Sequence, residues 1–166
     1  LVIDTTSTEA LEAALTMIGG KPVINSINLE DGTERAHRVC ALAKRYGAAV
    51  IALTIDEEGM AKTAQKKLDI ARRLYALAVQ EHGLHPGDLI IDPLTFTLGS
   101  GDATLTTAAI ETLDGIRLIK KELPGVWTLL GLSNISFGLS PFSRKVLNSV
   151  FLSHAVEAGL DMAIVN

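Results

Sequence analysis

Short apolar segments rich in β-branched residues alternate along this chain with longer amphipathic segments. The apolar segments are bounded by glycine, proline or polar residues and are apolar on both faces, which is typical of parallel strands covered by helices. Strict alternation of this kind predicts a parallel sheet with right-handed β/α crossovers. We expect six strands, at residues 1–4, 22–25, 49–55, 89–93, 128–132 and 162–165.

Five helices are expected between these strands, and two of them carry clear end signals. Thr6 has Glu9 three residues later, which is the spacing of a capping box at the start of the first helix. Ser140 followed by Pro141 marks the start of the last helix, which ends at Gly159. The expected helices cover residues 6–18, 31–46, 61–82, 103–123 and 141–159.

The third expected helix has an apolar face and a basic face. The apolar face predicts a buried stripe formed by Leu68, Ala71, Leu74, Tyr75 and Ala78. The basic residues are expected on the solvent face, and they are Lys62, Lys66, Lys67, Arg72 and Arg73.

One short phrase recurs at the ends of the expected strands and favours a barrel over an open sheet. Each copy has two or three apolar residues followed by a carboxylate or an amide, and the copies end at Asp4, Asn25, Asp92, Asn134 and Asn166. Asp and Asn also begin turns after strands. An open sheet gathers ligand groups at one switch point, whereas a barrel collects one polar residue from each of many strands around a single mouth. The recurrence on five of the six strands therefore favours a TIM-type β/α barrel.

The length of the chain makes this barrel incomplete. A full barrel of eight strands needs roughly 250 residues, and the chain has 166. The chain also begins at Leu1, inside an expected strand and without an initiator methionine, so we expect it to be a piece of a longer protein.

Four strand-end residues, Asp4, Asn25, Asp92 and Asn134, are expected to meet at the barrel mouth. Without Lys, Arg or His among them, the group is poorly suited to phosphate and to transition metals. A carboxylate accepts parallel N–H bonds, and an Asn side chain both donates and accepts. The set therefore suits a flat, neutral heterocycle with several N–H donors and a carbonyl, such as a pterin.

Composition argues against several other classes of protein. The single cysteine, Cys40, cannot form an internal disulfide, so a cytoplasmic location is expected. No apolar run approaches the ~18 residues of a membrane span, and the net charge of −4 argues against nucleic acid as a partner. We expect no metal site, because His37 and Cys40 lack a second ligand pair and residues 56–58 read as a solvated loop.

Five stretches of the chain carry a family resemblance. They are Val-Ile-Asn-Ser-Ile-Asn at 23–28, Leu-Thr-Ile-Asp-Glu-Glu-Gly at 53–59, Ile-Asp-Pro-Leu-Thr-Phe at 91–96, Leu-Gly-Leu-Ser-Asn-Ile-Ser-Phe-Gly at 130–138, and residues 147–166. Together they resemble the folate-binding domains of cobalamin-dependent methionine synthases, which belong to the wider group of pterin-binding barrels. The resemblance implies that residues 1–166 are a pterin-binding β/α-barrel domain that holds strands three to eight and lacks the first two.

The resemblance also assigns roles to individual residues. Asp4, Asn25 and Asp92 match the residues that hydrogen-bond the pterin ring, and Asn134 matches the Asn near the methyl-bearing ring nitrogen. The full set of expected pterin-binding residues is Asp4, Asn25, Asn28, Asp56, Asp92, Ser133, Asn134 and Ser136.

The implied reaction moves a methyl group from 5-methyltetrahydrofolate to cob(I)alamin carried on a separate corrinoid-binding domain. A tertiary amine is a poor leaving group, so the charge that develops on nitrogen must be relieved by a proton or by strong hydrogen bonds. No His, Lys or Glu stands at a motif position to act as a general acid. We therefore expect Asn134 and Asp92 to be the catalytic residues, which with ordered water form a network that favours the protonated nitrogen.

Other functions remain open from the sequence. The same motifs fit another corrinoid-protein methyltetrahydrofolate methyltransferase, and also a non-catalytic pterin-binding fragment. Dihydropteroate synthases share the fold, but their later strands carry basic residues where this chain has Leu-Ser-Asn-Ile-Ser at 132–136. Six parallel strands also leave two open edges, which predict a homo-oligomer through edge pairing.

Overall fold

The computed structural model describes residues 1–100 and 105–165, and a parallel sheet forms its centre. Six strands lie in the order β1-β2-β3-β6-β7-β8, and each pairs in parallel with its neighbour. The strands are β1 (Val2–Asp4), β2 (Val23–Ile27), β3 (Ala49–Leu53), β6 (Leu89–Asp92), β7 (Trp127–Gly131) and β8 (Met162–Ile164). The predicted sheet of six parallel strands is confirmed.

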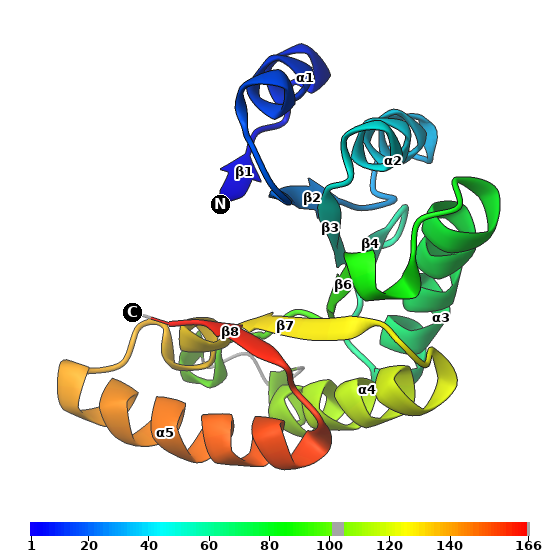
Figure 1. Cartoon of the computed structure of the whole chain (residues 1–166). Helices are drawn as coiled ribbons and strands as arrows, with labels where there is room; N and C mark the ends of the chain where they lie inside the picture. Colours follow the sequence, from blue (N-terminus) through cyan, green and yellow to red (C-terminus); the bar gives the residue numbers. More distant parts are fainter. Residues whose placement is uncertain (101–104, 166) are drawn as a thin grey trace.

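The α-helices lie on the outer side of this sheet, which curls so that β1 and β8 border an open gap (Figure 1). In the described part of the chain they are α1 (Thr8–Met17), α2 (Glu34–Tyr46), α3 (Ala64–Tyr75), α4 (Ala108–Glu122) and α5 (Pro141–Ala158). The molecule is therefore a curled half-barrel, which confirms the incomplete TIM-type architecture.

Capping residues fix the ends of the helices. Ser7 is the cap of α1, because its extended backbone lets its Oγ accept a hydrogen bond from the Ala10 N–H at 3.1 Å. The expected cap at Thr6 was thus one residue too early. Ser140 caps α5 as predicted, and Gly159 ends that helix in the left-handed conformation with φ +107°.

Several local features differ from the prediction. The third helix starts at Ala64 and not at residue 61, because Thr63 caps it and its Oγ1 accepts a hydrogen bond from the Lys66 N–H at 3.2 Å. Residues 55–60, before it, form an antiparallel hairpin of two very short strands. The helix continues past Tyr75 as a π-helical segment. The elements absent from the prediction are β4 (Ile55–Asp56), β5 (Gly59–Met60), the π-helix η1 (Ala76–Glu81), and the 3₁₀ turns η2 (Pro86–Asp88), η3 (Leu98–Ser100) and η5 (Leu132–Ser136). The expected strand end at Asn166 and the expected helix start at Ala103 lie outside the described residues.

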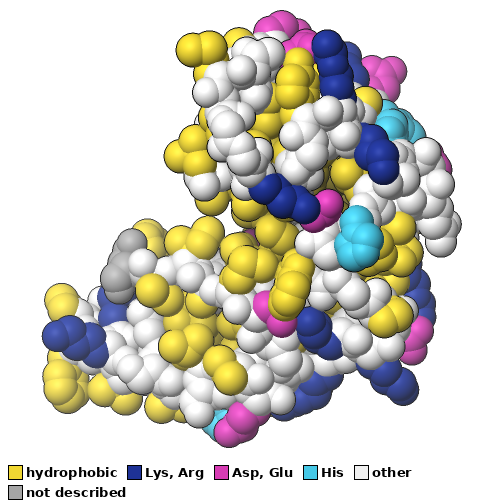
Figure 2. Space-filling view, viewed as in Figure 1, with side chains coloured by type: hydrophobic (Ala, Val, Ile, Leu, Met, Phe, Trp, Pro, Cys, Tyr) yellow, Lys and Arg dark blue, Asp and Glu magenta, His cyan; other side chains and the backbone are white. Residues whose placement is uncertain are grey.

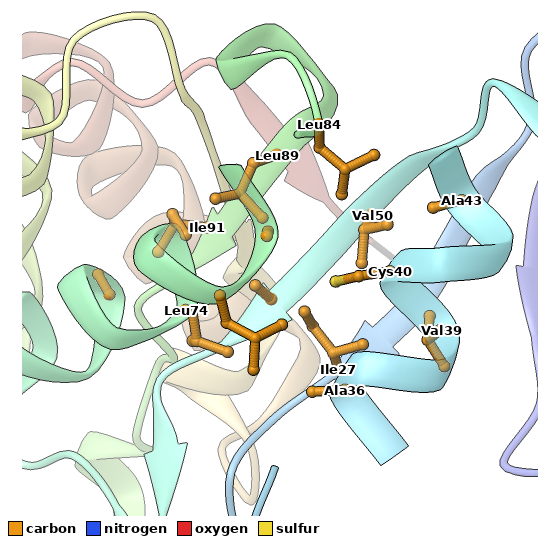
Figure 3. Packing of buried hydrophobic residues seen from close by; sticks show 14 of the residues in the cluster. Ile27, Ala36, Val39, Cys40, Ala43, Val50, Leu74, Leu84, Leu89 and Ile91 are labelled. Carbon is orange, nitrogen blue, oxygen red and sulfur yellow. The ribbon is translucent and has the colours of Figure 1, made fainter. Parts of the chain in front are cut away.

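The main hydrophobic core fills the space between the sheet and helices α1 to α4. Figure 3 shows Cys40 of α2 pointing toward Val50 of β3, with Ile27 of β2 and Leu74 of α3 beside them. A second cluster joins α4 and α5 to the outer side of β7, where Leu130 packs with Ile116 and Phe151. Burial of these apolar surfaces holds the helices against the sheet.

A small apolar cluster on the inner face of the sheet shows which strand-end side chains face the barrel interior. It contains Ala49 and Ile51 of β3, Ile90 of β6 and Leu129 of β7. Because side chains alternate between the two faces of a strand, residues two positions further along share this inner face.

The gap between β1 and β8 exposes apolar side chains. Val2 and Ile164 are each 56% exposed, and hydrophobic side chains line the hollow between the two edges (Figure 2). Within residues 1–100 and 105–165, no helix combines the length and the hydropathy that crossing a membrane requires.

Candidate functional site

Strand alternation places three of the predicted residues on the inner face at the carboxyl ends of their strands. Asn25 follows Val23 by two positions and Asp92 follows Ile90 by two; Ile90 belongs to the inner cluster and Val23 packs against it. Asp4 pairs in register with Asn25 on the neighbouring strand, so it shares the same face. The strand-end phrase therefore aims all three polar side chains toward the barrel interior.

Asp4 and Asn25 form the first part of the site. The Asn25 side-chain Nδ2 donates a hydrogen bond to Asp4 Oδ2 at 3.2 Å. Both residues line a polar pocket of about 300 Å³ at the ends of β1 and β2, together with Asn28, Glu30 and Asp31. The Asn28 side chain accepts a hydrogen bond from the Glu30 N–H at 3.1 Å, which shapes the loop that borders the pocket.

Arg35 of α2 holds the backbone of this pocket. Its guanidinium donates to the carbonyl oxygens of Ser26 at 2.7 Å, Thr5 at 3.1 Å and Thr6 at 3.3 Å. These carbonyls directly follow Asn25 and Asp4, so one side chain ties together the two loops that carry them. Sequence reasoning missed Arg35, because its partners are backbone atoms that leave no side-chain pattern.

Asp92 is a buried carboxylate at the end of β6 whose pKa is raised. It is 8% exposed, and its Oδ1 accepts a hydrogen bond from the Leu94 N–H at 2.8 Å. Burial raises the pKa of Asp92 to about 6, against the opposing effects of that hydrogen bond and of the positive charge on Lys67. This carboxyl group therefore changes protonation state near neutral pH.

Lys67 lies in the protein interior behind Asp92, and the prediction that placed it on the solvent face was wrong. Its exposed fraction is 0%, and its ammonium donates to main-chain carbonyls. The signal was present in the sequence, since Lys67 continues the buried stripe of Ala71, Leu74 and Ala78 at helical spacing. Lys67 was predicted to be exposed because of its charge, although its position on the helix indicates burial.

Asn134 lies just beyond β7, in the η5 turn, and its amide crosses the strand end. A Cβ added to Gly131 would stand 2.9 Å from Asn134 Nδ2. Gly131 shares the inner face with Leu129, two positions earlier, so the amide occupies the interior space that a side chain at 131 would fill. This puts the Asn134 amide at the barrel mouth.

Ser133 and Ser136 are buried in the η5 turn that carries Asn134. The Ser136 hydroxyl donates to the Ser133 carbonyl at 3.2 Å, and Arg144 donates to the same carbonyl at 3.4 Å. The Phe137 N–H also donates to the Asn134 carbonyl at 3.2 Å. These bonds fix the turn, and through it the direction of the Asn134 side chain.

Asp56 is engaged in the β4–β5 hairpin. Its carboxylate pairs with Lys66 at 2.7 Å and with Arg73 at 3.3 Å, and it accepts a hydrogen bond from the Glu58 N–H at 3.1 Å. Burial alone would raise the pKa of Asp56, but the bonds from Lys66 and Glu58 outweigh it and the pKa is lowered. These contacts tie the hairpin to α3.

The structure thus brings Asp4, Asn25 and Asn28 into one pocket and sets Asp92 and Asn134 at the ends of β6 and β7, beyond β3. The intervening strand β3 contributes the apolar side chains of Ile51 and Leu53 to the inner face. Among the described residues, no group of three or more His, Cys, Asp or Glu side chains is arranged to hold a metal ion.

Two curated proteins are similar in sequence over the whole chain. The chain is 50% identical over 169 residues to the methionine synthase of Mycobacterium tuberculosis and 48% identical to that of Mycobacterium leprae. It spans 14% of the length of each of these proteins.

Solved structures of dihydropteroate synthases share the fold. The enzyme from Xanthomonas albilineans in complex with 7,8-dihydropteroate superposes with a TM-score of 0.66 at 16% identity, covering 98% of this chain and 59% of that one. The enzyme from Thermus thermophilus in complex with 4-aminobenzoate gives a TM-score of 0.64 at 19% identity, covering 98% of this chain and 66% of that one.

A family of known proteins also matches the chain from end to end. The family described as "Pterin binding enzyme" matches residues 1–166, the whole of the sequence that supplies the half-barrel and its inward-facing polar strand ends. The chain belongs to the pterin-binding enzymes.

Proposed function

We propose that this chain binds 5-methyltetrahydrofolate at the inner mouth of the half-barrel and positions its methyl group for transfer to cob(I)alamin, as part of a methionine synthase. The observation that carries the proposal is the inward aim of Asp4, Asn25 and Asp92 from three separate strands, with the Asn134 amide in the turn that follows a fourth. The proposal takes residues 1–166 as strands three to eight of a pterin-binding barrel.

The chemistry of the pocket fits a pterin ring. The ring presents adjacent N–H donors that a carboxylate accepts in parallel, and Asp4 and Asp92 supply two carboxylates on the inner face. Asn25 offers both a donor and an acceptor to the same ring edge. The pocket at Asp4 and Asn25 measures about 300 Å³, the lower end of the range for small-molecule sites, which suits one bicyclic ring.

Asp92 and Asn134 supply the groups that the leaving nitrogen needs. When the methyl group departs, the C–N bond breaks, its electron pair stays on the folate nitrogen and that nitrogen takes up a proton. Asp92, with a pKa of about 6, is ionised at pH 7.5, and its negative charge favours the protonated nitrogen, which takes its proton from water. The Asn134 amide donates a hydrogen bond toward the developing charge without reorganising.

Cobalamin enters the proposal as the methyl acceptor, held by a separate corrinoid-binding domain, and it supplies a reduced cobalt nucleophile. The 50% identity to a methionine synthase favours this acceptor over the pyrophosphate chemistry of dihydropteroate synthases, to which identity is 16–19% in the structures compared. The acidic side chains of Asp4, Glu30 and Asp31 around the pocket also oppose an anionic pyrophosphate group. A reducing, cytoplasmic setting belongs to the same proposal, and Cys40 is a buried free thiol.

The proposal is tested by titrating 5-methyltetrahydrofolate into the protein at its natural full length at pH 7.5. Asp92→Asn removes a charged acceptor and should weaken binding by about 1.5–3 kcal/mol, roughly 10-fold to 150-fold. Asp114→Asn is the matched control, because Asp114 is half exposed on α4 and forms an ion pair with Arg117 on the same helix. Equal affinity of the Asp92→Asn variant and the unchanged protein would remove Asp92 from the site.

A further inference from the structure

The buried ammonium of Lys67 joins two loops at the barrel mouth. Lys67 donates to the Ala61 carbonyl at 2.9 Å, to the Pro93 carbonyl at 2.5 Å and to the Leu94 carbonyl at 3.4 Å. Ala61 follows the β4–β5 hairpin, and Pro93 and Leu94 directly follow Asp92. One cation therefore fixes the backbone that leaves the strand carrying the perturbed carboxylate.

The turn that Lys67 holds is strained. Leu94 has φ +66°, in the left-handed region that non-glycine residues rarely adopt. Its N–H donates to Asp92 Oδ1 at 2.8 Å, and its carbonyl also accepts from the Thr112 hydroxyl at 3.0 Å. Such a conformation persists only where the surroundings impose it, and it clusters at functional sites. Lys67, Thr112 and Asp92 together impose it here.

Lys67 is enclosed by packing on its other sides. A Cβ added to Gly115 of α4 would stand 2.8 Å from Lys67 Cδ, so the lysine stem lies directly against this glycine. Its Nζ is 5.1 Å from the centre of the Phe96 ring. With an exposed fraction of 0%, Lys67 does not reach a ligand in the barrel mouth, so any effect on a ligand must pass through Asp92 and its turn.

The charges around Asp92 come from two helices. Lys67 of α3 is the positive group, and burial lowers its pKa to about 8 against the opposing charges of Asp92 and Glu111. Glu111 of α4 accepts a hydrogen bond from the Ala64 N–H at 2.7 Å, at the start of α3. Removing the Lys67 charge leaves Asp92 without the cation that favours its ionised form, so the pKa of Asp92 must rise.

We propose that Lys67 is a positioning residue of the folate site, whose buried ammonium fixes the Pro93–Leu94 turn and keeps Asp92 ionised and aimed at the ligand. This inference rests on the proposed function, because it assigns Asp92 the role of accepting hydrogen bonds from the pterin. It adds a part to that site which touches neither the ligand nor the reacting atoms.

The test measures 5-methyltetrahydrofolate affinity from pH 5.5 to 8.5 in the full-length protein. Lys67→Met keeps the stem and removes the charge, so the midpoint of the pH dependence should move upward by at least about one unit. Affinity should fall at least about 3-fold at pH 6.5 and recover in large part by pH 8.5, a pattern that a loss of packing alone does not produce. Titration of the ligand itself is common to all variants and cancels in the comparison.

Two further variants keep the test decisive. Gly115→Ala retains the charge but displaces the lysine stem, and it should move the midpoint in the same direction by a smaller amount, which carries the test if Lys67→Met does not fold. Lys62→Met removes an exposed lysine before α3 and should leave the midpoint in place. No binding by the unchanged protein would overturn the proposed function, whereas normal binding with an unmoved midpoint in Lys67→Met and Gly115→Ala would overturn the role of Lys67 alone.

Discussion

The Asn134 side-chain amide stands 2.9 Å from the point that a Cβ on Gly131 would occupy, so the glycine makes room for the amide at the end of β7. Gly131 has φ −70°, which any residue can adopt, so the backbone conformation does not require a glycine here. The constraint at this position is therefore the neighbouring side chain and not the backbone.

Gly131→Ala should push the Asn134 amide out of its position at the end of β7 while leaving the fold intact. The new Cβ meets only the end of the Asn134 side chain, which can rotate away. We expect single-turnover methyl transfer to fall at least about 10-fold, and Asn134→Ala alone to lower it by roughly 10²–10³. The double variant should be no slower than Asn134→Ala, since the two changes act on one group. Rapid-quench kinetics on the full-length protein measures this, and full additivity of the two effects would contradict the shared mechanism.

Arg35→Lys should weaken 5-methyltetrahydrofolate binding by about 10-fold, although Arg35 is not assigned a ligand contact. A single ammonium cannot reproduce the planar fork that reaches carbonyls of two loops at once, so Asp4 and Asn25 lose their fixed relation. Isothermal titration calorimetry checks the affinity. Arg38→Lys, on the exposed face of the same helix, is the control and should bind normally; equal loss in both variants would point to a general effect on α2.

Asp92→Asn should stabilise the folded protein at pH 7.5 while it weakens ligand binding. The pKa of Asp92 is about 6 when folded and near 3.8 when unfolded, so the ionised form costs up to about 3 kcal/mol in the native state. Because the folded form binds the proton more tightly, this cost is absent below about pH 4 and grows as the pH rises to above 6. Urea unfolding at several pH values should show a stability gain at pH 7.5 that disappears toward pH 4, and a variant less stable than the parent at pH 7.5 would refute it.

Cys40 should report the opening of the core of the half-barrel. It is fully buried between α2 and the sheet (Figure 3), and burial raises the pKa of its thiol to about 12. The thiolate is the reactive form, so modification at pH 8 requires unfolding of this region. A thiol reagent should modify the site at the rate of unfolding and immediately in denaturant, as followed by peptide mass spectrometry; fast modification of the native protein would show that the α2–sheet packing opens freely.

The sequence was sufficient to predict where the polar residues that repeat at the strand ends of the candidate site lie in the fold. Asp4, Asn25 and Asp92 could be identified because each ends an apolar strand in the same phase, and strand alternation then fixes the face. Lys67 was misplaced because charge was taken as evidence of exposure, against a helical spacing that put it on the buried stripe. A buried lysine needs carbonyl partners from distant loops, and the spacing of residues on one helix does not reveal them.

Other features were missed for a different physical reason. The β4–β5 hairpin consists of two strands of two residues each, too short for a period to appear. The η5 turn begins within an apolar run, so Leu132 read as the end of a strand when it starts the turn that carries Asn134. Arg35 binds the main-chain carbonyls of Thr5, Thr6 and Ser26, and these bonds exist only after the loops have folded.

The order of strands in the sheet repeats their order along the chain, and this has a consequence for how the molecule holds together. Each β/α unit touches mainly the units before and after it, as in a linear array. The local free energy of unfolding should therefore fall from the middle of the sheet toward both ends. Amide hydrogens of β1 and β8 should therefore exchange with solvent sooner than those of β3 and β6. The same arrangement lets a further strand pair with the free edge of β1 or of β8, without changing the path of any strand already in the sheet.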